Sequence, residues 1–580
     1  MELDDVSRLS ITGEYVFELL DKWVKQVGPR RFVATTSDDA SNCRKGRHLL
    51  TNKYPWIFDL PDACHNLSNG IKDLCNLAPF KPHISQLREV LAFMSLSTYT
   101  ADHFDDARKE LKVARGLESI GETRFGTIYW SLNSLLRGMD ALEKVVKNPD
   151  LCIESEVLHR IFDDEDSQHD FTQGLKRLGA VLMPFARAIQ CLESKETDAA
   201  DIYMYWLAVV AQLKDLMDKA SRKYEKAVVE DIRRIVNYRF NLLINNERAS
   251  NIYLTAFALD PNNRGAPIHD IPNPLAVPSI RINPATSSIT PKLKLEARVG
   301  LSLAVLLRNE YHDAYSTVGI TIDQARQAMK DYNPRLAHLT PDDALTALRT
   351  QMSAFLTVQE PFTRRKLPNQ SNRDYWAQFV GLPDSDVLAA LAVKIFSAVP
   401  VSMVDERTMS VVTWLNGPKR RRQTVETVSN YLAIRGYNHI DIENTRRKPL
   451  SVYWRDIEAD IHGTRTSSSK DPEPTSSGTA ESESAGSQLS APDPEDSFKL
   501  KWLDDGLPDL SHSEHGQFNL EQEFDIKRYL DILADSASPQ TTTRNETAGG
   551  STLVGGPKGG KHGGAAAASA MPDDGSWSRW

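Results

Sequence analysis

Only two short segments near the amino terminus have the composition of β-strands, and helical segments separate and flank them. The segments 31–36 and 56–60 are strand-like, a helix is predicted over 12–28, and further helices end near residues 53 and 77. A strand–helix–strand order predicts two parallel strands in one sheet. A parallel sheet needs both faces covered and usually has about four to six strands. We therefore expect the rest of this sheet to precede residue 1, or to come from a later segment or a partner.

The remainder of the chain is predicted to be helical and then disordered. From about residue 84 to 370 there is helical periodicity without a convincing series of strands, and 371–445 returns to helices. Residues 446–580 are predicted to form a mostly disordered tail with a short helix near 518–534, since small and polar residues dominate its ends. The predicted helices of the middle part are 84–98, 103–117, 127–147, 172–193, 200–245 (one or two helices) and 292–313.

Composition narrows the class of protein. Hydrophobic residues make up 41% of the chain, enough for a sizeable core, and the net charge of −9 argues against a wholly basic nucleic-acid coat protein. Five cysteines without a CxxC pair favour reduced thiols in the nucleus or cytoplasm over a disulfide framework or a zinc knuckle. No apolar run reaches the 18 or more residues that span a bilayer, so no membrane partner is expected.

Two acidic positions stand out. Glu406 and Arg407 lie between two apolar helical segments, after Pro400 has ended the first one. A charge drawn into the interior is costly unless it is paired. The pair is therefore either a structural ion pair or a carboxylate delivered to a metal site. Asp38 follows the first strand, where α/β proteins often place working side chains, but an Asp there can also cap the next helix.

Four ordered motifs resemble those of the hAT family of transposases, whose core is a ribonuclease H-like fold split by a large helical insertion. The resemblance covers about residues 12–445. Residues 36–42 (TSDDASN) resemble the turn with the second catalytic Asp, and 62–65 (DACH), followed by Asp73, resemble the C/D-x-x-H motif. Residues 122–126 (ETRFG) resemble T-R-W-x-S, and 402–410 (SMVDERTMS) resemble S-x-x-x-E-R-x-F/M-S, which carries the catalytic Glu.

The resemblance implies an α/β fold with a large all-α insertion, an incomplete ribonuclease H-like fold that is mostly helical overall. Residues 1–83 would be the amino-terminal part of the core and 84–370 the insertion. Residues 371–445 would hold the last core helices and the dimerisation region, before the tail. A homodimer or higher homo-oligomer, DNA as a further partner and a nuclear location are implied as well.

The resemblance also implies roles for particular residues. Asp38 and Glu406 would be the second and third catalytic carboxylates and would hold Mg²⁺ or Mn²⁺ if the protein is active. Arg124 and Phe125 would contact DNA, although packing within the helical part is the alternative for both. Asp62, His65, Asp73 and Arg407 would be structural members of the motifs.

Two departures from the family pattern argue against an active transposase. Eleven residues precede the first helix, too few for the strands that carry the first catalytic Asp, and Phe125 replaces the family's Trp. We therefore expect a transposase-derived protein that dimerises, retains residual DNA binding and is not catalytically competent. The alternatives are a fragment of an active two-metal-ion transposase, whose first Asp lies upstream, and a relic that does not fold stably.

Overall fold

The computed structural model describes most of the chain up to residue 445. The described residues are 9–121, 126–193, 197–219, 223–244, 251–264, 295–316, 320–367, 370–402, 408–409, 411–413, 415 and 423–445. The predicted tail over 446–580, with its helix near 518–534, lies outside them.

The amino-terminal elements follow the predicted order. They are α1 (Gly13–Val27), a 3₁₀ turn η1 (Pro29–Arg31), β1 (Ala34–Ser37), α2 (Ser41–Lys53), β2 (Phe58–Pro61) and α3 (Ala63–Cys75). Thr12 caps α1 by accepting a hydrogen bond from the backbone N–H of Tyr15, and Gly28 ends it with a φ of 107°. The strands are parallel, with Ala34 opposite Phe58. The prediction of two parallel strands is confirmed.

Helices dominate the rest of the described chain, as predicted, and β1 and β2 are the two strands described in it. The predicted segment 200–245 forms two helices. The elements are α4 (Lys81–Leu96), α5 (Thr98–Glu110), α6 (Thr127–Val146), α7 (Glu156–Phe162), α8 (Glu165–Leu192), α9 (Ala199–Lys219), α10 (Lys226–Leu243), α11 (Ile252–Leu259), η3 (Pro261–Asn263), α12 (Leu295–Tyr315), α13 (Ile322–Tyr332), α14 (Pro341–Leu356), α15 (Asn372–Ala377), α16 (Asp386–Ile395) and α18 (Val425–Thr445).

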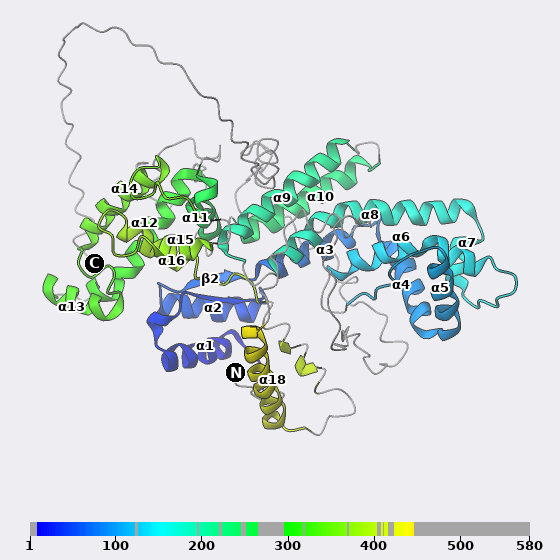
Figure 1. Ribbon diagram of the computed structural model, residues 1–580, viewed down its shortest axis with the longest axis horizontal. Coiled ribbons are helices and arrows are strands. Elements are labelled where there is room, and N and C mark those ends of the chain that lie inside the picture. The colour runs from blue at the N-terminus through cyan, green and yellow to red at the C-terminus, as the bar shows by residue number, and fades with distance from the viewer. Residues whose placement is uncertain are drawn as a thin grey trace, which may run out of the picture.

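The helices form two groups with the strands between them (Figure 1). On one side α3 leads away from β2 and packs against α8 and α10. On the other side α11 packs against α9, α12 and α16. One hydrophobic cluster runs through both groups and includes Phe58 of β2 and Ala398. The division into domains at 83/84 and 370/371 stays a prediction. Among the described helices, none combines the length and apolar character needed to cross a membrane.

The crossing of α1 and α2 depends on two glycines. A Cβ atom on Gly46 would lie 2.5 Å from Cγ1 of Val16, and one on Gly13 would lie 2.6 Å from Cβ of Lys45. The backbones of the two helices therefore approach more closely than any larger residue allows.

The substitution Gly46→Ala tests the close packing of α1 against α2, because helix propensity and packing change the stability in opposite directions. Propensity alone favours Ala inside a helix by up to about 1 kcal/mol, whereas overpacking costs about 1–3 kcal/mol. We expect Gly46→Ala to lower the urea midpoint of unfolding. Gly436→Ala on α18, where a Cβ would meet no atom within 4 Å, is the control and should leave the midpoint unchanged or raised. A stabilised Gly46→Ala protein would contradict the close crossing.

Candidate functional site

A late segment of the chain lies against the carboxyl ends of both strands. The hydroxyl of Thr36 donates to the carbonyl oxygen of Val399 at 2.7 Å, and the N–H of Ala63 donates to that of Pro400 at 3.2 Å. The N–H and the hydroxyl of Ser402 both donate to Oδ2 of Asp62. Residues 399–402 thus extend across the two strand ends without forming a strand themselves. A later segment thus contacts the small sheet, but it adds no strand to the two that the structure describes, so the source of the missing strands stays a prediction.

Asp38 follows β1 directly and does not cap the next helix. The N-cap residue of α2 is Ala40, whose side chain makes no hydrogen bond. Oδ1 of Asp38 is buried and accepts no hydrogen bond within the part of the chain that the structure describes. A buried carboxylate oxygen without a partner is costly, so this atom is suited to accept a hydrogen bond or bind a cation. Burial, together with the Asp38 carboxylate, raises the pKa of the Cys43 thiol to about 11.

Asp62 follows β2 and has partners for both oxygens. Its Oδ1 accepts a hydrogen bond from the backbone N–H of His65 at 2.7 Å and caps α3, while its Oδ2 binds Ser402. The ring of His65 is half-buried and contributes nothing to this cap. In the DACH segment the His position thus acts through its backbone.

Asp73 lies near the other end of α3 and belongs to a contact between helices. Its Oδ2 is 2.6 Å from Nε of Arg239 on α10, and both side chains are largely buried. Burial raises the pKa of Asp73, and the guanidinium of Arg239 opposes that shift. This ion pair joins α3 to α10, consistent with a structural role.

The guanidinium of Arg47, on α2, holds the end of β1 in place. The residue is 2% exposed, and its Nε donates to Oδ1 of Asp59 on β2 at 2.8 Å. Its Nη1 donates to the hydroxyl of Ser37 and to the carbonyl oxygens of Ser37, at 3.3 Å, and Asp38, at 2.6 Å. Its Nη2 lies 3.3 Å from Oδ1 of Asp39. Sequence reasoning missed Arg47, although a charged residue between Gly46 and Leu50 on the buried face of a helix was the available signal.

Four predicted site residues, Glu406, Arg407, Arg124 and Phe125, lie outside the described residues. Ser402, four positions before Glu406 in the sequence, is the last described residue leading into that motif. Among the described residues, no three His, Cys, Asp or Glu side chains are grouped so that they could share a metal ion. The structure brings Asp62 into contact with the beginning of the 402–410 motif, and Asp38 follows Ser37, whose carbonyl oxygen accepts from the N–H of Asp62 at 2.9 Å.

No family model matches the sequence, and no curated protein is similar to it.

Removing Arg47 should disrupt this end of the sheet. In Arg47→Met, Asp59 stays buried without its cation, and breaking a buried pair in this way costs about 3–5 kcal/mol. We expect a large drop in the urea midpoint, measured by circular dichroism. Arg44→Met is the matched control, because Arg44 is 43% exposed and pairs with the same Asp39 at 3.4 Å. It should cost less than about 1 kcal/mol. Equal losses in both variants would show that Arg47 contributes no more than a surface charge.

Proposed function

We propose that this chain is a transposase-derived protein of the hAT type that forms a homodimer through its carboxyl-terminal helices and contacts DNA. The observation that supports it best is the placement of residues 399–402 against the strand ends beside Asp38 and Asp62. In the resemblance, the turn after the first of these strands and the motif that begins at Ser402 supply parts of one site. The contacts that hold the late segment here are the bond from Thr36 to Val399, 363 positions apart, and the bonds from Ser402 to Asp62, 340 positions apart.

The exposed surface of α18 supports dimerisation. Tyr431, Ile434 and Tyr437 follow one another at three-residue steps, and they are 49%, 60% and 68% exposed. Large apolar side chains that gather on one helix are typical of a surface that is buried on association. Figure 1 shows α18, in yellow, at the lower edge of the molecule. A second copy of the chain is the partner that the resemblance implies for this region, and DNA contact through Arg124 and Phe125 stays a proposal.

A double substitution on α18 tests the dimer. We expect the wild-type chain to be a dimer by sedimentation equilibrium, and Ile434→Ser with Tyr437→Ser to raise the dimer dissociation constant at least about tenfold, because two buried apolar side chains are lost. Asn430→Ser, an exposed polar position on the same helix, is the control and should leave the constant unchanged. A monomeric wild-type protein, or a double variant that dimerises like the wild type, would contradict this role of α18.

An active transposase is the second candidate function, and the unpartnered Oδ1 atom of Asp38 is the observation that favours it. Oδ1 of Asp38 is buried and unpartnered at the carboxyl end of a parallel strand. Carboxylate oxygens are the ligands that Mg²⁺ and Mn²⁺ prefer, so Asp38 fits such an ion, and Glu406 would be its companion ligand. In the two-ion chemistry that the resemblance implies, one such ion would activate the attacking water or 3′ hydroxyl and the other would stabilise the leaving oxygen. Asp38 would hold the ion, and Arg47 would hold the backbone of Asp38.

Metal binding separates the two candidates. If Asp38 is a ligand, Asp38→Asn raises the dissociation constant for Mn²⁺ at least about tenfold in calorimetry, equivalent to about 1.4 kcal/mol. Asp39→Asn is the control, because that carboxylate pairs with Arg44 and Arg47. Metal-dependent nicking of DNA by the wild type that Asp38→Asn abolishes supports the enzyme. Mn²⁺ binding without nicking supports the dimerising protein, and identical Mn²⁺ affinity in Asp38→Asn and the wild type excludes Asp38 as a ligand.

A further inference from the structure

A pocket of about 90 Å³ lies among α4, α8 and the beginning of α10, and none of its lining residues belongs to β1 or β2. A single buried water needs about 10–15 Å³, so the space is sufficient for a small polyatomic ligand. Its wall includes His83 of α4, Gly174 and Arg177 of α8, and Lys223 and Tyr224 before α10.

His83 lines this pocket with a buried imidazole ring that has an unpaired nitrogen. It is 8% exposed, and its Nδ1 has no hydrogen-bond partner among the described residues. The ring packs against the backbone of α8, because a Cβ atom on Gly174 would lie 2.4 Å from it. The lining histidine thus has a ring nitrogen that is left without an acceptor or donor among the described residues, and a bound molecule is one way to satisfy it.

Two cationic side chains line the pocket, while the carboxylate of Asp170, which is not a lining residue, opposes the lowering of the His83 pKa by burial. Arg177 and Lys223 both line it, and within the described part of the chain neither forms an ion pair with a carboxylate. The hydroxyl of Tyr224 donates to the carbonyl oxygen of Arg177 at 3.0 Å, which fixes the segment before α10 against α8. Glu225 is the acidic residue of the wall and is exposed to solvent.

The first turn of α10 carries backbone N–H groups without acceptors in the helix, and Val228 of this turn lines the pocket. Glu225 is its N-cap residue and makes no side-chain cap, and the N–H of Val229 is the first to bond back, to the carbonyl oxygen of Glu225. The N–H groups of Lys226 to Val228 precede that bond and have no acceptor inside the helix. Together with the helix dipole, such groups bind phosphates in many proteins.

We propose that this pocket binds a phosphate group, with the Nδ1 of His83, the guanidinium of Arg177, the ammonium of Lys223 and the backbone N–H of Val228 in the first turn of α10 as its donors. These donors come from three elements and surround one small space, which suits a ligand with several equivalent oxygens. The proposal goes beyond the dimerising function and does not depend on it. The phosphate can be the free ion or the phosphate ester of a small molecule, because both present the same oxygens.

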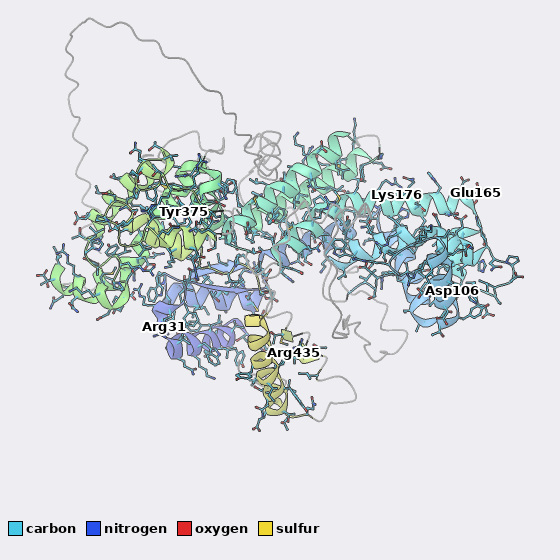
Figure 2. The ribbon with its side chains drawn as sticks, viewed as in Figure 1. Arg31, Asp106, Glu165, Lys176, Tyr375 and Arg435 are labelled. Carbon is cyan, nitrogen blue, oxygen red and sulfur yellow. The ribbon has the colours of Figure 1, made fainter. Side chains whose placement is uncertain are left out.

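Titration of the full-length protein with inorganic phosphate by calorimetry tests the site. We expect saturable binding at one site per chain, and Arg177→Gln should raise the dissociation constant at least about tenfold, equivalent to about 1.4 kcal/mol. Lys176→Gln is the matched control, since Lys176 makes the same charge change one residue earlier on α8 and is exposed (Figure 2). It should change the constant less than about twofold, because exposed charges away from a ligand contribute little. His83→Asn is a second variant and should also weaken binding.

A second titration with a nucleoside monophosphate distinguishes the two sources. Tighter binding of the nucleotide than of inorganic phosphate supports the proposal with an ester as the ligand, and equal or weaker binding supports it with the free ion. Circular dichroism and the thermal midpoint show whether each variant is folded. No binding of phosphate by the wild type would overturn the proposal, as would equal affinities in Arg177→Gln, Lys176→Gln and the wild type.

Discussion

The amino-terminal segment depends on the buried guanidinium of Arg47, which joins α2 to both strands of the small sheet. The backbone hydrogen bonds between two short strands are too few to fix these elements by themselves. The guanidinium bonds to Asp59 on β2, to the end of β1 at Ser37 and Asp38, and to Asp39 at the beginning of the following turn. A charge this deeply buried is stable only when its donors are satisfied, so Arg47, β2 and the β1–α2 turn depend on one another. The backbone of Asp38 is fixed in this way, whereas its Oδ1 is left without a partner.

Side chains from much later parts of the chain pack against the small sheet and the segment that leads into it. Besides the segment 399–402, the hydroxyl of Tyr253 on α11 donates to the carbonyl oxygen of Pro61 at 3.3 Å, and the side-chain amide of Asn309 on α12 donates to that of Pro55 at 2.9 Å. Lys394 of α16 pairs with Glu310 and lies 5.2 Å from the centre of the Phe58 ring. Parallel strands need cover from other elements, and here α11, α12 and α16, which follow the strands by about 190 residues or more, provide it.

Local patterns explain which elements could be predicted. The amphipathic stripe of α1 and the apolar residues of β2 are readable from neighbouring residues, and both elements are found within a few residues of the expected positions. The sequence-based reading did not identify α11, because all eight of its residues are buried and no polar face marks a period. At the site, Asp38 was recognisable by its place after a strand. The role of Arg47 and the bonds from Ser402 to Asp62 depend on long-range contacts that no local pattern contains.

The two aspartates at the strand ends, Asp38 and Asp62, differ in the hydrogen bonding of their carboxylate oxygens. Asp62 has one oxygen bonded to the backbone of α3 and the other to Ser402, so its acceptors are used for structure. Asp38 keeps a buried oxygen with no described partner, and only a proton, a donor or a cation can satisfy it. Burial and the Asp38 carboxylate raise the pKa of the neighbouring Cys43 thiol to about 11, which favours the protonated thiol at neutral pH. Of the two aspartates, Asp38 is therefore the one with an acceptor left over, while Asp62 holds Ser402 at the start of the 402–410 motif.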